Sequence, residues 1–374
     1  MRVLMTGGGT SGHVNPALAI AETIKLNING SEIAFVGTPH GIENKLVPRA
    51  GYKLYHVDVK GFSRSLSPAN IKAAYLAAVS PHRAKKIIRE FMPDVVIGTG
   101  GYVCWPILKA ASDMKIHTIL HESNAYPGVA VKMLSGRAEK ILLNFAETEK
   151  YLKCPKDKLV VVGNPLRSGF APEGDSKAAK RRAGIDPDKY DKLILSYGGS
   201  MGAQRVNEAV LAMMRDFTSK HPEILHILAV GAIEYKDATE MFRAYGLDKF
   251  DNLKLLEYIY DMPEKMAAAD LIICRAGAMT MSEVAAMRKP AIFIPSPNVT
   301  ENHQYKNAKV FEDAGAGIII EERELTGGEP LTSRAAELLS DRERLDAMGN
   351  AAGQFAVADS NRRILSEIKR TVLG

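Results

Sequence analysis

The sequence predicts an α/β protein built from two doubly wound, Rossmann-like domains that face each other across a cleft. Its 374 residues are enough for two domains of ordinary size. Short β-rich runs alternate with amphipathic stretches along most of the chain, which is typical of parallel sheets covered by helices. The two halves also open alike, because RVLMTGGGT and KLILSYGGS each lead an apolar strand into a glycine turn.

The predicted strands alternate with helical patterns in both halves. In the first half the strands are Val3–Thr6, Glu32–Val36, Lys53–Val57, Val95–Gly98, Thr118–His121, Lys140–Leu143 and Leu159–Val162. In the second half they are Lys192–Tyr197, Leu225–Val230, Leu253–Glu257, Leu271–Cys274, Ala291–Ile294 and Gly317–Glu321. The clearest helical patterns are Pro16–Asn27, Pro81–Phe91 and Arg205–Met214.

Composition also indicates where the domains meet. The stretch from Gly163 to Asp191 is rich in proline, glycine and charge, so we expect a linker there. The first domain is then 1–167 and the second is 168–349. Residues 350–374 predict a terminal helix that packs back on the first domain.

The charge of the chain is unevenly distributed. Hydrophobic residues make up 46% and charged residues 25%, which argues against long disorder, a collagen repeat or a coiled coil. Residues 1–167 hold 22 basic and 12 acidic residues, whereas residues 168–374 hold 27 and 31. This asymmetry suggests an anionic partner for the first domain: nucleic acid, a membrane surface or a phosphorylated substrate.

The basic excess is concentrated between Lys60 and Met92, where Glu90 is the one acid. The basic residues there are Lys60, Arg64, Lys72, Arg83, Lys85, Lys86 and Arg89. The apolar residues of 72–91 could face the core of a helical layer, or they could form a patch that enters lipid while the cations contact headgroups. No RNP-like or helix-turn-helix pattern is present, so nucleic acid is the weakest of the three partners.

Cysteine usage and hydropathy indicate the cellular compartment of the protein. Cys104, Cys154 and Cys274 are widely spaced and form no C-x-x-C, which indicates neither a disulfide framework nor a zinc site and fits a reducing cytoplasm. The apolar run Val3–Met5 is too short for a signal peptide, and no run approaches the roughly 20 apolar residues that span a bilayer. Any contact with a membrane is therefore expected to be peripheral.

The first glycine turn has the form of a dinucleotide fingerprint. Gly7, Gly9 and Gly12 satisfy G-x-G-x-x-G after a strand and before a helix. The fingerprint also needs an acid near the end of the second strand, but that segment, 35–38, reads FVGT, so NAD binding loses most of its support. The turn either lets a ligand approach N–H groups at a helix N-terminus or is purely structural.

His13 follows this turn at the edge of the sheet where open α/β folds bind ligands, so it is a candidate general base. A lone histidine can equally be structural. Thr99–Tyr102 and His121–Asn124 each follow another strand of the same domain, and each alone could be an ordinary turn. Because all three loops converge on one rim, we favour a site there.

The second domain offers groups for a nucleotide. Gly198–Ala203 opens a helix whose N–H groups and dipole suit a diphosphate, with Ser200 adding a hydroxyl. Glu283 either complements a helix dipole or accepts the hydroxyls of a ribose. Arg167 either pairs with phosphate or is an exposed linker residue.

Two absences narrow the chemistry. The one Asp-x-Asp, at 186–188, lies in the linker, so a metal-chelating carboxylate pair is not supported. The chain has no G-x-x-x-x-G-K-[ST], which excludes a P-loop kinase or ATPase. Phosphate must be held by helix termini and side chains.

With these motifs in order, the sequence resembles the MurG family of UDP-N-acetylglucosamine-dependent transferases of bacterial peptidoglycan synthesis. The resemblance runs essentially end to end through GGGTSGHVNPALA, GTGGYVCWP, HESNAYPG, VGNPLR, GGSMGA, RAGAMTMSE and the QYKNA segment with Pro295, Gln304 and Asn307. The chain departs from the family where Ser123 replaces a common glutamine and where Met201 replaces a longer polar residue.

The resemblance implies a GT-B glycosyltransferase whose first domain binds the acceptor and whose second binds the UDP-sugar. It implies transfer of N-acetylglucosamine to the 4-hydroxyl of the muramoyl sugar of lipid I, which gives lipid II with inversion and without a cofactor or a required metal. By the same resemblance, Thr10, Ser11, Gly12 and Asn124 reach toward the donor sugar, and His13 is the base. It further implies that phosphate and ribose are held by Arg167, Ser200 and the loop Ala278, Met279, Thr280, Met281, Ser282 and Glu283, that Gln304 touches the phosphate-sugar portion, and that the backbone near Ile259 touches the uracil.

We therefore expect a peripheral enzyme on the cytoplasmic face of the cell membrane. Its expected partners are UDP-N-acetylglucosamine, lipid I and the anionic inner leaflet, and not nucleic acid. Three alternatives stay open: a GT-B transferase for a different lipid, a nicotinamide-dependent oxidoreductase, and a non-catalytic nucleotide-sugar-binding module. The last would leave His13 and Asn124 without a role.

Overall fold

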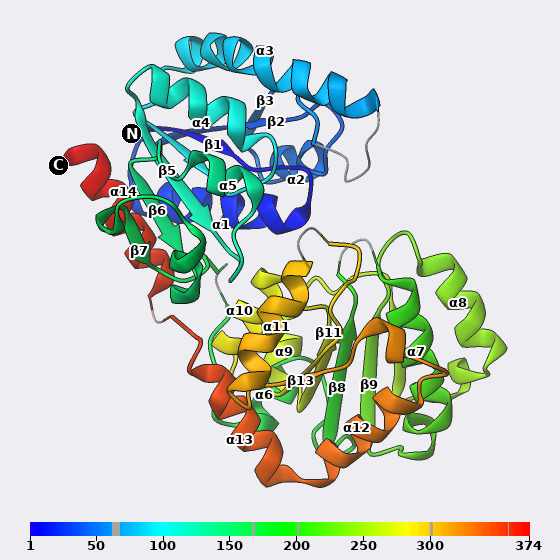
Figure 1. The fold of residues 1–374 in the computed structure, drawn as a ribbon. Helices are drawn as coiled ribbons and strands as arrows, with labels where there is room; N and C mark the ends of the chain where they lie inside the picture. Colours follow the sequence, from blue (N-terminus) through cyan, green and yellow to red (C-terminus); the bar gives the residue numbers. More distant parts are fainter. Residues whose placement is uncertain (62–67, 167–168, 200–201, 300–301, 358) are drawn as a thin grey trace. The chain divides into compact units, whose positions relative to one another are not determined.

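The computed structural model describes residues 1–374 except 62–67, 167–168, 200–201, 300–301 and 358, with the backbone alone for 68–74 and 77. The chain divides into two compact units (Figure 1). Unit 1 comprises Met1–Arg167 and Val357–Gly374, and unit 2 comprises Ser168–Ala356.

Unit 1 is built on a parallel sheet with the order β3-β2-β1-β4-β5-β6-β7. Its strands are β1 (Arg2–Thr6), β2 (Glu32–Gly37), β3 (Lys53–His56), β4 (Val95–Gly98), β5 (His117–Glu122), β6 (Lys140–Leu143) and β7 (Leu159–Val161). The central strands are continuous apolar runs because helices cover both of their faces. The loops after β1, β4 and β5 leave the same edge from neighbouring strands, which is where parallel sheets place ligands.

Helices cover both faces of this first sheet. They are α1 (Ser11–Asn27), α2 (Glu43–Arg49), α3 (Pro68–Phe91), α4 (Cys104–Asp113), α5 (Val129–Leu134) and α14 (Ser360–Leu373), with the 3-10 helices η1 (Ala146–Tyr151) and η2 (Lys156–Lys158). On one face, α3, α4 and α5 pack with Leu4 and Leu120. On the other, α1, α2 and α14 pack with Val3 and Ile119. Residues next to each other along a strand therefore serve opposite layers.

Unit 2 has a parallel sheet with the order β10-β9-β8-β11-β12-β13. Its strands are β8 (Lys192–Tyr197), β9 (Ile224–Ala229), β10 (Leu253–Leu256), β11 (Leu271–Cys274), β12 (Ala291–Phe293) and β13 (Ile318–Ile319). Its helices are α6 (Ser176–Arg182), α7 (Gln204–Asp216), α8 (Tyr235–Ala244), α9 (Met262–Ala268), α10 (Ala278–Ala286), α11 (His303–Asp313), α12 (Glu329–Ser340) and α13 (Arg342–Gly353), with the 3-10 helices η3 (Thr218–Lys220), η4 (Leu247–Lys249) and η6 (Glu322–Glu324).

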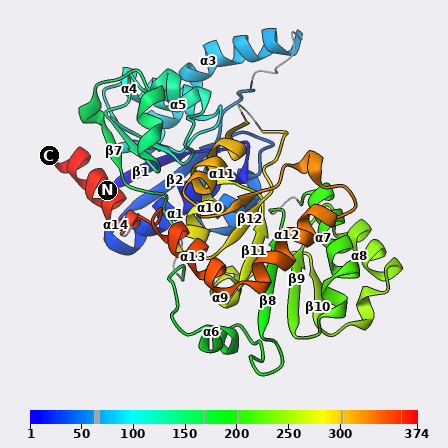
Figure 2. The same cartoon turned by 60° about the horizontal axis from the view of Figure 1, so that its bottom comes forward.

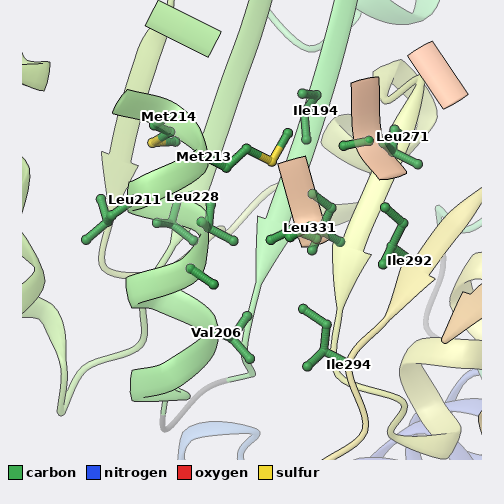
Figure 3. Close-up of a cluster of buried hydrophobic side chains, with 14 of the residues drawn as sticks. Ile194, Val206, Leu211, Met213, Met214, Leu228, Leu271, Ile292, Ile294 and Leu331 are labelled. Atoms are coloured by element: carbon green, nitrogen blue, oxygen red, sulfur yellow. The ribbon is translucent and has the colours of Figure 1, made fainter. Parts of the chain in front are cut away.

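The second sheet is also covered on both faces (Figure 2). The core in Figure 3 joins Ile194 and Ile292 of the sheet to Val206 of α7 and Leu331 of α12, all of them fully buried. On the other face, α9 packs against β8, and Phe311 of α11 meets the Phe293 ring edge-on. The two hydrophobic layers hold β8 and β11 at the centre of the unit.

The predicted fold class and every predicted strand are confirmed, with strand ends that differ by at most two residues. Two predicted helix starts are wrong. Pro16 lies inside α1 and Pro81 lies inside α3, although proline usually sits at the start of a helix. Helix α1 tolerates the lost hydrogen bond because Val14, Pro16 and Ala17 are all buried against the sheet.

The predicted linker contains a helix. Asp175 caps α6 by accepting hydrogen bonds from the N–H groups of Lys177 and Ala178, and α6 packs against α9. Lys180 forms a buried ion pair with Asp270, with 3.0 Å between Nζ and Oδ2. The basic run that resembled a solvated linker is therefore partly a packed helix.

The prediction of one terminal helix over 350–374 is also wrong. Residues up to Gly353 complete α13 of unit 2, and a separate helix, α14, covers unit 1. Asn361 of α14 holds the backbone of Leu166 through hydrogen bonds in both directions, at 2.7 and 3.1 Å. Among the described residues, no helix is long and apolar enough to cross a membrane.

Candidate functional site

The glycine loop after β1, Gly7–Thr10, interlocks with the loop after β4. Gly9 has φ +85°, and a Cβ there would lie 2.9 Å from the ring of Tyr102. Gly101 has φ +82°, and a Cβ there would overlap the carbonyl oxygen of Gly8. Both positions need glycine because of the backbone angle and the close approach. The predicted convergence of these two loops is therefore observed.

His13, the third residue of α1, is half-buried beside both loops. A Cβ on Gly100 would lie 2.6 Å from the imidazole Nδ1, so the bare backbone of that loop forms a wall for the ring. The hydroxyl of Thr99 donates a hydrogen bond to the His13 carbonyl at 2.6 Å. Thr10, Ser11 and Gly12 lie at or near the surface at the start of the same helix, so the predicted first-domain residues gather at one helix end.

A buried carboxylate that the sequence interpretation missed lies beneath the glycine loop. Glu43, the first residue of α2, has no exposed surface. It accepts hydrogen bonds from the N–H of Gly9 at 3.2 Å and from the N–H and hydroxyl of Thr38 at 2.8 Å each. The dinucleotide fingerprint predicts an acid at 35–38, whereas the acid Glu43 lies five residues beyond that segment. The glycines at 37 and 41 are the signal that could have revealed it.

Asn124, in the loop after β5, is held by a second missed acid. The carboxylate of Glu122 accepts hydrogen bonds from the Asn124 backbone and side-chain N–H groups, at 2.9 Å each, and from the Gly128 N–H at 2.8 Å. Burial raises the pKa of Glu122. The hydroxyl of Thr148 donates to the Asn124 carbonyl at 3.0 Å. The backbone and the side chain of Asn124, a predicted ligand residue, are thus both held by hydrogen bonds.

His121, which directly precedes Glu122, has a structural role. It is fully buried, and its Nε2 lies 3.1 Å from the carbonyl oxygen of Gly163. Burial lowers the pKa of His121 to about 4. The imidazole therefore stays neutral at pH 7 and ties β5 to the backbone that leaves β7.

In unit 2, the helix N-terminus after β8 presents N–H groups. Ala203 is the N-cap of α7 and provides no side-chain cap, and the first turn has no acidic residue. Gly202, with φ +87°, packs so closely on the Val230 carbonyl that a Cβ would overlap it. The predicted contact residues Ser200 and Arg167 lie outside the described part of the chain.

The second helix N-terminus of unit 2 is that of α10, capped by Gly277. Ala278 and Met281 are buried, whereas Met279, Thr280, Ser282 and Glu283 are half-buried. Burial and the charge of Glu283 raise the pKa of Tyr197, which ends β8. Glu283 lies in α10, which follows β11, the strand next to β8.

Loops after β11 and β12 are tied together next to α10. The guanidinium of Arg275 donates to the carbonyls of Ile294 at 3.1 Å and Pro295 at 3.2 Å and forms an ion pair with Glu322. The side-chain oxygen of Gln304 accepts a hydrogen bond from the Ser296 N–H at 2.9 Å. These contacts hold the start of α11 in place, and Arg275 had been assigned no role from the sequence.

A pocket of about 310 Å³ opens beside this segment, at the carboxyl edge of the second sheet. Its lining residues are Arg205, Pro295, Pro297, Asn302, Tyr305, Glu321, Glu322 and Arg323. Further along the same edge, Ile259 is buried between the exposed Tyr258 and Tyr260, whose ring centroids are 5.0 Å apart. The predicted uracil contact at Ile259 therefore concerns its backbone and not its side chain.

The basic segment of unit 1 divides by helix face. Ala84 and Ile88 of α3 are buried in the core, which favours the packing interpretation for that stretch. Lys86 and Arg89 are exposed, whereas Arg83 forms an ion pair with Asp58. Tyr75 is 66% exposed, so an apolar group does accompany the cations. The structure does not describe Arg64, nor the side chain of Lys72.

Within the described ranges, no group of three or more His, Cys, Asp or Glu side chains is arranged to hold a metal ion. Unit 1 offers two glycine-rich loops with polar side chains, and unit 2 separately offers two helix N-termini with polar side chains.

Comparisons with known proteins agree with this arrangement. The glycosyltransferase family 28 N-terminal domain matches residues 3–143, and the family 28 C-terminal domain matches residues 193–364. The chain is 42% identical over 369 residues to the UDP-N-acetylglucosamine--N-acetylmuramyl-(pentapeptide) pyrophosphoryl-undecaprenol N-acetylglucosamine transferase of Acetivibrio thermocellus, covering 99% of this chain and 98% of that protein. The transferase of the same name from Lactococcus lactis subsp. cremoris is 37% identical over 370 residues, with 99% of each chain covered.

Solved structures agree as well. The crystal structure of Acinetobacter baumannii MurG superposes with a TM-score of 0.76 at 28% identity and covers 99% of each chain. The UDP-GlcNAc 2-epimerase from Neisseria meningitidis, bound to UDP-GlcNAc, superposes with a TM-score of 0.66 at 14% identity over 99% of this chain and all of that one. The second likeness concerns the fold alone.

Proposed function

The chain belongs to glycosyltransferase family 28, and on that premise we propose how its residues carry out its reaction. It transfers N-acetylglucosamine from UDP-N-acetylglucosamine to lipid I, which gives lipid II, as its relatives do by name. The transfer needs a base for the acceptor hydroxyl and a stabilised diphosphate leaving group.

Unit 1 supplies the base. The observation that carries this assignment is that His13 is held between two glycine loops, against Gly100 and with its carbonyl bonded to Thr99. His13 removes the proton of the muramoyl 4-hydroxyl as that oxygen attacks the anomeric carbon. The bond from this carbon to the diphosphate oxygen breaks on the opposite face, so the configuration inverts and UDP leaves. Thr10, Ser11, Gly12 and Asn124 orient the sugars with their polar groups.

Unit 2 holds the donor. The N–H groups that open α7 take the diphosphate, because a helix N-terminus without a carboxylate favours an anion. Ser200 and Arg167 add a hydroxyl and a charge there. In α10, Glu283 accepts the ribose hydroxyls, with the turns of Ala278, Met279, Thr280, Met281 and Ser282 around it. Gln304 contacts the phosphate-sugar portion and the Ile259 backbone contacts the uracil. No step uses a metal ion.

The decisive experiment for this function is a transfer assay. Purified protein is incubated with labelled UDP-N-acetylglucosamine and a lipid I analogue, with and without a chelator. Transfer to the muramoyl 4-hydroxyl in both samples is expected. Absence of transfer would refute the function, and activity lost only with chelator would refute metal independence. A fluorescence titration with NADH tests the oxidoreductase alternative, and we expect no binding.

The enzyme acts at the cytoplasmic face of the membrane, where the basic side of unit 1 contacts anionic lipid. Exposed cations on α3 and the exposed Tyr75 of the same helix support this part of the proposal. Each lysine or arginine near an anionic surface contributes about 1 kcal/mol, and the contribution falls with salt.

Vesicle binding tests the attachment. Replacing Arg83, Lys85, Lys86 and Arg89 with glutamine is expected to weaken binding to anionic vesicles at least tenfold, and high salt is expected to do the same to the unmodified protein. The matched control neutralises Lys236, Arg243, Lys249 and Lys254, which are exposed on unit 2. Equal losses of vesicle binding in both variants, or vesicle binding that does not depend on salt, would contradict attachment through this specific basic surface.

A further inference from the structure

The buried carboxylate of Glu43 belongs to none of the roles assigned above. We propose that Glu43 is a positioning residue for sugar transfer, which holds the glycine loop in the conformation that presents His13. This proposal rests on the proposed role of His13 as the base. Glu43 touches neither substrate in it and acts through the backbone of the loop.

The carboxylate connects two separate segments of unit 1. One oxygen, Oε2, accepts from the Gly9 N–H at 3.2 Å, and the other, Oε1, accepts both hydrogen bonds of Thr38 at 2.8 Å. Gly9 and Glu43 are 34 residues apart in the chain. Since a buried ionised group needs hydrogen-bond donors, the carboxylate and the loop hold each other in place.

The surrounding backbone is shaped around this side chain. A Cβ on Gly37 would lie 2.5 Å from Glu43 Cγ, and one on Gly8 would lie 2.7 Å from Oε1. A Cβ on Gly41 would overlap the carboxylate itself. Three glycines, one from the loop after β1 and two from the stretch between β2 and α2, therefore leave a space that Glu43 fills, which allows little movement of the carboxylate.

The glycine loop is held from its other side as well. Strand β1 lies between β2 and β4 in the sheet, so the loop after β1 has a neighbouring loop on each side. Glu43 follows β2, whereas Gly101 and Tyr102 follow β4 and press on Gly8 and Gly9. Removing the Glu43 contact leaves the loop held from the β4 side alone, so its position is less well fixed.

Movement of the loop reaches His13 through one turn of backbone. The carbonyl of Thr10, directly after Gly9, accepts the hydrogen bonds from the N–H groups of His13 at 3.1 Å and Val14 at 3.2 Å. These bonds start α1, so a shift of Gly9 and Thr10 shifts the first turn that carries the imidazole. Misplacing a reacting group by about 1 Å costs on the order of 100-fold in rate.

A purely structural role for Glu43 is the competing explanation. An acid at the first position of a helix complements its dipole and is worth about 0.3–1 kcal/mol. Its loss would then lower the melting temperature and change no kinetic constant of the folded enzyme. Kinetic constants of the folded protein therefore distinguish the two explanations.

The test is Glu43→Gln in the full-length enzyme. The amide keeps the size of the side chain, but its NH₂ must face either Gly9 or Thr38, donor against donor. We expect kcat to fall about 10- to 100-fold, while the KM for UDP-N-acetylglucosamine and the affinity for UDP stay within twofold. Glu367→Gln is the matched control, because Glu367 is a buried carboxylate of the same unit on α14 that pairs with Arg370. It should lower the melting temperature and leave kcat unchanged.

A second variant protects the test against misfolding. Glu43→Asp keeps the charge but is one methylene shorter, so it cannot reach Gly9 and Thr38 together, and the same fall in kcat is expected. Unchanged kcat in either folded variant would overturn the proposal, as would an equal fall in Glu367→Gln. Failure of the proposed function is a different result, because the unmodified enzyme would then transfer no sugar at all.

Discussion

The two glycine turns that open the two sheets look alike in sequence and differ in electrostatics. In unit 1 the Gly9 N–H is bonded to the buried carboxylate of Glu43. In unit 2 the turn leads to α7, whose N-cap Ala203 adds no side-chain acceptor and whose first turn has no acid. A carboxylate under the first turn disfavours phosphate, whereas α7 begins without an acid of its own, although the Glu234 side chain lies beside Gly202. The two turns, alike in sequence, therefore differ in how well they suit an anion.

The largest effect that would sharpen this comparison is expected in unit 1. His13→Ala should lower kcat by roughly 10²- to 10⁴-fold, because general-base catalysis contributes that much. The affinity for UDP should be unchanged, because the nucleotide is assigned to unit 2. Steady-state kinetics with a lipid I analogue and calorimetry with UDP measure the two quantities.

The control for this variant is His117→Ala. His117 is a half-buried histidine of the same unit whose Nδ1 lies 2.8 Å from Glu139. Its removal should leave both quantities unchanged. If His13→Ala keeps a near-normal kcat, the base lies elsewhere and the assignment of proton transfer to the first turn fails.

A smaller and opposite effect is expected in unit 2. Glu283→Ala should raise the KM for UDP-N-acetylglucosamine by about 10- to 100-fold, because hydrogen bonds to a charged group are worth about 1.5–3 kcal/mol each. At saturating donor, kcat should change little. Donor saturation curves and UDP calorimetry provide the measurement.

Glu264→Ala, at an acid in the first turn of α9 in the same unit, is the matched control and should bind donor normally. An unchanged donor KM in Glu283→Ala would remove the ribose contact. A fall in kcat alone would place Glu283 in the chemistry and break the separation of roles between the units.

The smallest effect concerns the pH dependence of the stability of unit 1. Burial holds the pKa of His121 at about 4, below the ordinary value of 6.5. Between these two pH values, His121 therefore binds a proton in the unfolded chain but stays neutral in the folded chain. Stability from this residue is present above pH 6.5 and is lost as the pH falls from there toward 4. Between pH 7 and pH 5 unit 1 should lose about 2 kcal/mol of unfolding free energy from this residue.

The single tryptophan, Trp105, packs on the core of unit 1, so its fluorescence in denaturant titrations follows that unit. His121→Gln should remove this part of the pH dependence. His226→Gln is the control, since His226 is a buried histidine of unit 2 whose pKa burial lowers to about 3, and it should leave the tryptophan signal unchanged. If the two variants shift that signal equally, the units unfold together.

Much of the fold could be predicted because its signals are local. Apolar runs such as 95–98 and 192–197 are strands in any parallel sheet, and the glycines that follow mark the edge where ligands bind. The loops at 99–102 and 121–124 are predicted to lie at that edge because each follows a predicted strand. The starts of two helices could not be predicted from local sequence. Pro16 and Pro81 lie inside helices whose packing outweighs the preference of proline for the start of a helix.

What the sequence by itself determined is the fold class, the order of the strands along the chain and the family, because period, glycine turns and motif order are written in consecutive residues. Only the tertiary structure decided which polar groups serve those motifs. Glu43 reaches Gly9 across 34 residues, and Lys180 turns part of an apparent linker into a packed helix through Asp270. Both contacts join segments distant in the chain, and both are needed because a buried charge is costly without a partner, whereas burial is a property that consecutive residues do not encode.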